Sequence, residues 1–75
     1  MDFPQYRARF DKKSYYKVIS KHEMEEIQFI GQRKFMHNLK ADKYFEKVLI
    51  QSILDADDEL YFKIEATEYK ILLES

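Results

Sequence analysis

The chain has 75 residues, of which 45% are apolar and 16% are Phe or Tyr, and it has no Cys. It is therefore expected to be one small domain, and it has no disulfide, thiolate metal site or cysteine nucleophile. The formal net charge of −1 hides a split, because nine of the 13 Lys and Arg lie in residues 1–40 and nine of the 14 Asp and Glu lie in residues 41–75. A surface with regions of positive and of negative electrostatic potential can steer a charged partner as it approaches.

The first half of the chain is expected to form antiparallel strands. Four segments combine aromatic, β-branched and alternating basic residues: 6–10, 15–19, 27–30 and 35–39. Such residues are typical of strands. The polar run 11–14 suits a turn between the first two strands, and the run 31–33, which begins with Gly31, suits a short hairpin loop between the last two.

Residues 20–30 are open to two interpretations. Ser20 and Glu23 fit a helix capping box, and Gly31 could end a short helix. On the other hand, Ile27 and Phe29 share a face only if the segment is a strand. The strand is favoured.

The second half is expected to be helical. From Asp42, taken as the N-cap, one apolar stripe of a helix is predicted to comprise Tyr44, Phe45, Val48, Leu49, Ile53 and Ala56. A second short helix is expected from Glu65 to Glu74, with Tyr69, Leu72 and Leu73 on one side. The predicted fold class is thus α+β, a single domain spanning residues 1–75. It has two layers, in which a four-stranded antiparallel meander is covered on one face by two C-terminal helices.

This arrangement predicts two different sheet faces. The face beneath the helices would hold Tyr6, Ala8, Phe10, Tyr16, Val18, Ile27, Phe29, Phe35 and Leu39. The open face would be aromatic and basic, and its predicted partner-binding residues are Arg7, Arg9, Tyr15, Lys17, Met36 and Lys40. Arg and Tyr are common at the centres of protein interfaces. The alternatives are a solvated face whose cations prevent edge-to-edge aggregation, and a stacking platform for nucleic acid, although no RNP pattern is present.

A run of acidic residues follows the first predicted helix. The acidic patch comprises Asp55, Asp57, Asp58 and Glu59. A calcium loop is excluded because Leu60 stands where the loop needs Gly and Ala66 stands where it needs Glu. The patch is expected to be a solvated loop that ends the helix, or a surface that meets a basic partner or another copy of the chain.

Residues able to carry catalysis are few. His22 and His37 are the two imidazoles, no Ser lies in a nucleophile motif, and one Gly in the chain cannot build a phosphate-binding loop. We therefore expect no enzymatic activity, no catalytic residues, no metal and no cofactor. The enzymatic alternative is an active site shared across a dimer interface, with an activity that depends on His22 or His37.

The expected function is that of a small binding or regulatory module, which acts by occupying a partner macromolecule through the aromatic and basic sheet face. Twelve Phe and Tyr are more than a core of this size encloses easily, so the partner is expected to be another protein or, as a homodimer, a second copy of the chain. Nucleic acid or a phosphorylated ligand on the same face is the alternative. The longest apolar run is Val48 to Ile50 and no signal sequence is visible, which favours a cytoplasmic protein without membrane contact.

Overall fold

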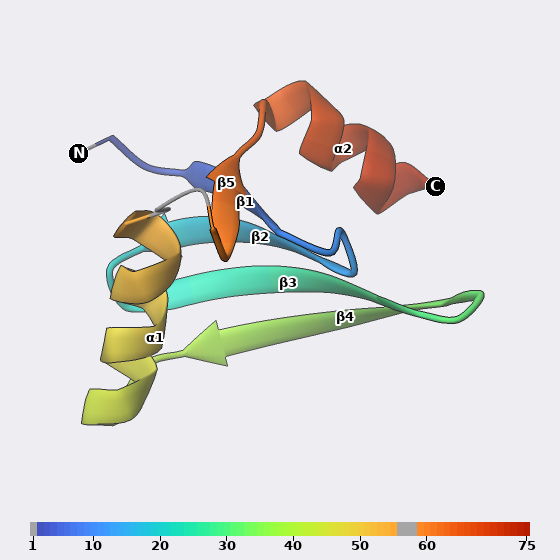
Figure 1. The fold of residues 1–75 in the computed structure, drawn as a ribbon. Coiled ribbons are helices and arrows are strands. Elements are labelled where there is room, and N and C mark those ends of the chain that lie inside the picture. The colour runs from blue at the N-terminus through green and yellow to red at the C-terminus, as the bar shows by residue number, and fades with distance from the viewer. Residues whose placement is uncertain (1, 56–58) are drawn as a thin grey trace.

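An antiparallel sheet and two helices make up the fold, which was obtained as a computed structural model that describes residues 2–55 and 59–75 (Figure 1). In chain order the elements are β1 (Gln5–Arg9), β2 (Ser14–Ser20), β3 (Glu23–Ile30), β4 (Arg33–Lys40), α1 (Tyr44–Asp55), β5 (Tyr61–Lys63) and α2 (Ala66–Glu74). The sheet has the strand order β4-β3-β2-β1-β5 and every neighbouring pair is antiparallel. The predicted α+β class is confirmed. None of the helices in the described part of the chain has the length and apolar character needed to cross a membrane.

The strands of the first half lie where the residue pattern indicates. Residues 23–30 form a strand and not a helix, so the favoured interpretation of this segment is confirmed. β3 and β4 are joined by a two-residue turn in which Gly31 has a φ of +60°. Gly adopts this value without strain and is favoured at the first position of a II′ hairpin turn.

A short strand between the helices was not predicted, and the expectation of four strands is wrong. β5 pairs with the free edge of β1, with Ala8 opposite Phe62. Two backbone hydrogen bonds extend this pairing, from Phe10 N to Leu60 O (2.8 Å) and from Ile64 N to Tyr6 O (3.3 Å). Three residues are too few for a periodicity to be read from sequence.

The two helices cover opposite faces of the sheet, so the expected two-layer arrangement is also wrong. α1 packs on the face that carries Tyr16 and Val18, here called the α1 face. α2 packs on the face that carries Tyr6 and Lys17, here called the α2 face, where the Tyr69 ring lies 5.3 Å from the Tyr6 ring. Successive residues of a strand point to opposite sides, so each helix covers a different set of side chains.

The position of β5 explains how the chain changes face. α1 ends on one side of the sheet, the chain then enters the plane of the sheet as β5, and α2 begins on the other side (Figure 1). A direct loop between the helices would have left both on one face. Because both faces are covered, the predicted inner residues are divided between two cores, with Tyr16, Val18 and Leu39 on the α1 face and Ala8 and Ile27 on the α2 face.

α1 packs through a different side from the one predicted. Its buried side chains are Ile50, Ile53 and Leu54, which join the cluster formed by Tyr16, Val18, Met24 and Ala41. The predicted stripe lies mainly on the outside, with Tyr44, Phe45, Val48 and Leu49 exposed; its last member, Ala56, lies outside the described residues. The helix has apolar residues on two sides, and sequence periodicity did not distinguish which side meets the sheet.

The start of α1 is one residue later than predicted. The carbonyl oxygen of Lys43 accepts the first helical hydrogen bond, from Lys47 N at 3.2 Å, so Lys43 and not Asp42 is the N-cap. The Glu46 carboxylate accepts hydrogen bonds from the backbone N–H groups of Asp42 (3.2 Å) and Lys43 (2.9 Å). This is the Glu half of a capping box.

Tyr16 makes the fold sensitive to alkaline pH. It is 6% exposed, and burial, followed by the nearby Glu26 carboxylate, raises the pKa of Tyr16 to about 12. In the unfolded chain this phenol ionises near pH 10. Its contribution to stability is therefore complete below pH 10 and is lost as the pH rises to about 12.

We expect this group alone to lower the free energy of unfolding by about 2–3 kcal/mol over that interval. Urea unfolding of the wild type and of Tyr16→Phe, at pH ~9 and pH ~12, measures the effect. The variant should lose less stability than the wild type between the two conditions. Equal losses would contradict the assignment to Tyr16.

Candidate functional site

The structure divides the six predicted partner-binding residues between the two faces. Tyr15, Lys17, Met36 and Lys40 lie on the α2 face, and Arg7 and Arg9 lie on the α1 face. The reason is the β1–β2 register, which pairs Arg7 with Tyr16 and not with Tyr15. A change of one residue in register moves a whole strand's side chains to the other face, so the expectation of one shared face is wrong.

Arg7 is inside the fold. It is 2% exposed, and its guanidinium donates to the carbonyl oxygens of Tyr6 (2.9 Å) and Leu54 (3.3 Å) and to the Gln5 side chain (3.2 Å). Desolvation by burial lowers the pKa of Arg7. The bond to Leu54 joins β1 to the C-terminal end of α1, where a cation is favoured by the helix dipole. Arg7 therefore links two elements and does not lie on a surface.

Arg9 is at the surface but has contacts within its own turn. Its Nε lies 3.7 Å from the Asp11 carboxylate, and its guanidinium carbon lies 5.6 Å from the centre of the Phe10 ring. These contacts are exposed and contribute little to stability. They place Arg9 at the end of the sheet that carries the β1–β2 turn.

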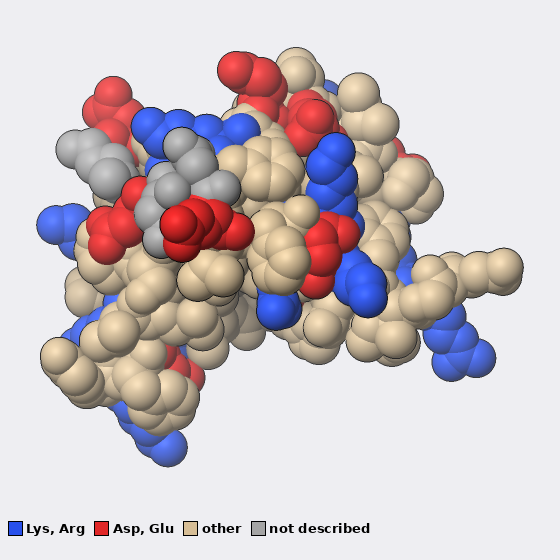
Figure 2. Space-filling view, viewed as in Figure 1, with Lys and Arg blue, Asp and Glu red and all other residues tan. Residues whose placement is uncertain are grey.

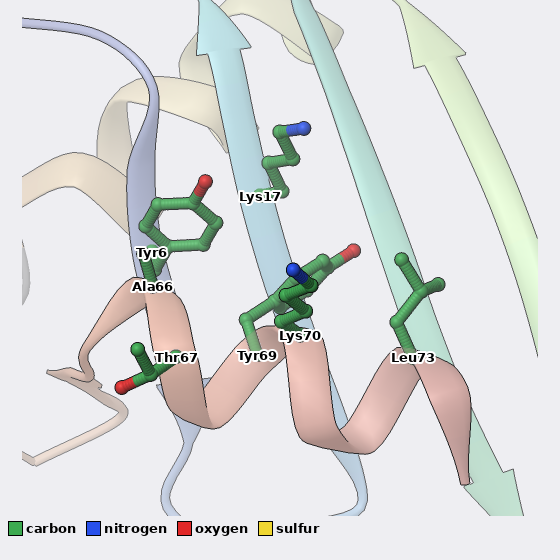
Figure 3. Close-up of a pocket in the computed structure, with 7 residues that line it drawn as sticks. All are labelled: Tyr6, Lys17, Ala66, Thr67, Tyr69, Lys70 and Leu73. Atoms are coloured by element: carbon green, nitrogen blue, oxygen red, sulfur yellow. The ribbon is translucent and has the colours of Figure 1, made fainter.

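A cavity lies where α2 crosses the α2 face of the sheet (Figure 3). It has a volume of about 250 Å³. This cavity is here called the α2 cavity. It is lined by Tyr6, Lys17, Ala66, Thr67, Tyr69, Lys70 and Leu73. Figure 3 shows Tyr6 rising from β1 and Lys17 from β2, while the other five side chains come from α2. One predicted binding residue, Lys17, thus belongs to a site that the sequence did not reveal.

Tyr69 holds α2 in place against the sheet. It is 2% exposed, and its hydroxyl donates a 2.8 Å hydrogen bond to the Glu25 carboxylate on β3. Burial, followed by this hydrogen bond to Glu25, raises the pKa of Tyr69 far above the usual range of a phenol. The other end of α2 is fixed by Lys34, whose ammonium group donates to the carbonyl oxygens of Leu73 (2.9 Å) and Ser75 (2.6 Å). The cavity walls are therefore built on anchored elements.

The cavity combines apolar walls with two cations. Tyr6, Tyr69 and Leu73 supply the apolar surface, and Lys17 and Lys70 supply the charge. Within the described residues neither ammonium group has a carboxylate oxygen within 4.0 Å. At about 250 Å³ the cavity is smaller than the roughly 300–1,000 Å³ of small-molecule sites. Its volume corresponds to one or two amino-acid side chains, and Lys17 and Lys70 place positive charge at its border.

The remaining α2-face residues surround this region without forming a basic platform. Met36 is 45% exposed, Lys40 is exposed, and the Tyr15 ring packs edge-on against Phe29 at 5.9 Å. Glu25 on β3 lies directly opposite Lys17 on β2 in the strand register. Acids and cations therefore alternate across this face.

The predicted acidic patch is only partly described. Asp55 ends α1 and accepts a 2.9 Å hydrogen bond from the Gln51 side chain, and Glu59 is exposed. Asp57 and Asp58 lie outside the described residues.

Neither imidazole lies in a cluster of catalytic type. His37 is exposed on the α1 face, where its Nε2 is 3.1 Å from the Gln28 side-chain oxygen, and His22 is exposed in the β2–β3 turn. In residues 2–55 and 59–75 no group of three His, Cys, Asp or Glu side chains is placed to hold a metal ion.

The sequence contained one usable signal for the α2 cavity. Tyr69 stands on the apolar side of the predicted second helix, and a Tyr there needs a hydrogen-bond partner when buried. Nothing in the sequence marks Lys70 and Leu73 as cavity residues, because their position in the cavity depends on which sheet face α2 covers. Comparisons with protein-family models, with curated proteins and with solved structures find no match to this chain. Its functional assignment therefore rests on geometry.

Proposed function

We propose that this chain is a small non-enzymatic binding module that occupies a partner protein through the α2 face. The α2 cavity would receive an apolar side chain of the partner, and Lys17 and Lys70 would contact acidic residues on either side of it. The observation that carries this proposal is a side-chain-sized apolar cavity bordered by two lysines without a carboxylate partner in the described chain.

Several neighbouring residues support an extended contact. Tyr15, Met36 and Lys40 lie on the same face and would form its rim. Tyr and Met are enriched in protein interfaces, whereas rim charges mainly affect the rate of association. Arg7 and Arg9, on the α1 face, have no part in this surface.

Nucleic acid or a phosphorylated ligand is the alternative for the same face. Nucleic acid is bound through a row of cations that neutralise successive phosphates, and its affinity falls steeply with salt. In the strand register Glu25 is opposite Lys17 and Glu23 is opposite Lys40, so no such row of cations forms on this face among the described residues. This alternation of charge favours a protein partner.

The test uses defined probes. A panel of short acidic peptides, each with one central Leu or Phe, is titrated against the chain, with single-stranded oligothymidine as the nucleic-acid probe. We expect selected peptides to bind and Lys17→Glu to weaken them at least tenfold, which is about 1.4 kcal/mol. NMR shift changes on binding should centre on Tyr6 and Tyr69.

Lys63→Glu is the matched control, because Lys63 is an exposed lysine in β5 on the α1 face. It makes the same change of charge away from the α2 cavity and should leave peptide affinity unaltered. Binding of oligothymidine without any peptide binding would replace the proposal by its alternative. Equal losses in Lys17→Glu and Lys63→Glu would show that net charge, and not the cavity, decides binding.

A further inference from the structure

β4 has one side of its backbone free. It is the border strand next to β3, and in the described part of the chain no strand pairs with its other side (Figure 1). It has eight residues, whereas β5 at the opposite border of the sheet has three. A border strand presents a row of unpaired N–H and C=O groups with which a further strand can pair.

Two backbone hydrogen bonds show which residues of β4 carry these free groups. The N–H of Ala41, just after β4, donates to the carbonyl oxygen of His22, just before β3, at 2.7 Å. The N–H of Phe29, which is opposite Lys34, donates to the carbonyl oxygen of Lys13 at 2.7 Å and is therefore directed away from β4. Bonded and non-bonded pairs alternate along antiparallel strands. The backbone groups that point away from the sheet, here called the outer edge of β4, are thus those of Lys34, Met36 and Asn38.

The outer edge lacks the features that usually prevent strand addition. Border strands are commonly protected by a proline, by a β-bulge, by charges or by their short length. β4 has no proline, and its register with β3 is regular along its whole length. Its formal charges lie at its two ends, and residues 35–39 between them have none. The centre of the strand is therefore open to pairing.

The charges of β4 indicate what kind of strand it would accept. All of them are basic, at Arg33, Lys34 and Lys40. Within the described residues neither Arg33 nor Lys40 has a carboxylate oxygen within 4.0 Å. The Glu23 carboxylate, opposite Lys40 in the register, accepts a 3.4 Å hydrogen bond from the Asn38 side chain. Figure 2 shows the β3–β4 hairpin projecting from the body of the molecule, with basic and uncharged groups on its visible side.

The inner neighbour of β4 shows the composition that suits it. β3 has three Glu, no Lys or Arg, and apolar residues between and after the acids. Opposite charges on neighbouring strands stabilise their pairing, and like charges destabilise it. A second copy of β4 would bring three further cations and no acid to the outer edge. An acidic strand of another protein is therefore favoured over self-pairing.

We propose that the outer edge of β4 takes up an extended segment of a partner protein as a further strand, and that this segment is acidic at its ends and apolar at its centre. Backbone hydrogen bonds would supply affinity, as in other cases of strand addition. Acidic side chains would lie beside Arg33 and Lys40. Apolar side chains would contact Phe35 on the α1 face and Met36 on the α2 face, which are 38% and 45% exposed.

Hydrogen exchange of the full chain tests the proposal directly. The probes are peptides of about eight residues, with alternating Val and Thr between Asp residues at both ends, and the same peptides with Lys in place of Asp. An Asp peptide should slow exchange of the amides of Lys34, Met36 and Asn38 at least tenfold. The amides of Phe35 and His37, which face β3, should change little. The Lys peptides should leave exchange unaltered.

Asn38→Pro is the matched variant. Proline removes one N–H of the outer edge and no hydrogen bond between β3 and β4, because this N–H points away from the sheet. It should weaken binding of the Asp peptide at least tenfold while the chain stays folded by thermal unfolding. Asn38→Ala is the control, because it also loses the contact with Glu23 but keeps the N–H. It should bind as tightly as the wild type.

Four results would each overturn the proposal. They are unchanged exchange at the outer edge with every Asp peptide up to ~1 mM, equal binding of Asp and Lys peptides, a folded Asn38→Pro chain that binds like the wild type, and protection of the outer edge by the chain alone at high concentration. The last would show pairing of two copies. Should Asn38→Pro not fold, exchange in the wild type decides.

The outer edge is a different site from the α2 cavity, whose lining comes from β1, β2 and α2. A peptide seated in that cavity would shift the signals of Tyr6 and Tyr69 and leave the amides of the outer edge in exchange. The inference therefore goes beyond the proposed function, and the two can fail separately.

Discussion

Replacement of Ile53 by Ala is expected to lower the free energy of unfolding by about 3 kcal/mol, within the ~2–5 kcal/mol found for buried Ile→Ala changes. Ile53 is fully buried and joins α1 to Val18 and Met24 of the sheet. The change removes apolar contact and leaves a cavity that a packed core fills only in part. A domain of 75 residues has a total stability of roughly 4–11 kcal/mol, so this loss is a large fraction of it.

Thermal and urea unfolding measure this effect, and the melting temperature should fall by more than ~10 °C. The comparison is Val48→Ala, on the exposed side of α1. Because Val48 is 44% exposed, its replacement should cost less than about 1 kcal/mol. A larger loss for Val48 than for Ile53 would mean that α1 packs through the opposite side.

Tyr69→Ala is expected to release α2 from the sheet and to cost about 3–5 kcal/mol, the range for removal of a large buried ring. Tyr69 is the one buried residue of α2, and it provides both the ring contact with Tyr6 and the hydrogen bond to Glu25. Without it, α2 retains the hydrogen bonds from Lys34, which are exposed. The α2 cavity should disappear with the helix, and peptide binding should be lost.

Hydrogen exchange of the α2 amides, measured beside urea unfolding, separates release of the helix from loss of the whole fold. Tyr69→Phe is the control, because it keeps the ring and removes only the hydroxyl. It should cost about 1 kcal/mol and retain protection of α2. Retained protection in Tyr69→Ala would show that Tyr69 is not the anchor.

Local pattern was sufficient to predict β1 to β4 and both helices, because each of these segments is long enough to show its own periodicity. The arrangement of the two helices about the sheet was predicted wrongly. β5 has three residues, and without it the route of the chain from one face to the other could not be deduced. The placement of both helices on one face followed from that omission.

The candidate site failed to emerge from the sequence for a related reason. Lys17 and Tyr15 were assigned to the same face as Arg7, although the register places Arg7 opposite Tyr16. Which face a strand residue points to depends on the number of residues in the connecting loop, and composition does not fix that number.

The buried side of α1 was also predicted wrongly. The helix has two apolar sides, and the side with more aromatic residues is the exposed one.

The division of α1 and α2 between opposite faces has a consequence for occupancy. A molecule seated in the α2 cavity would leave the exposed side chains of α1 uncovered, because they lie on the other side of the sheet. Each helix can therefore meet a different molecule at the same time, and neither molecule would displace the other.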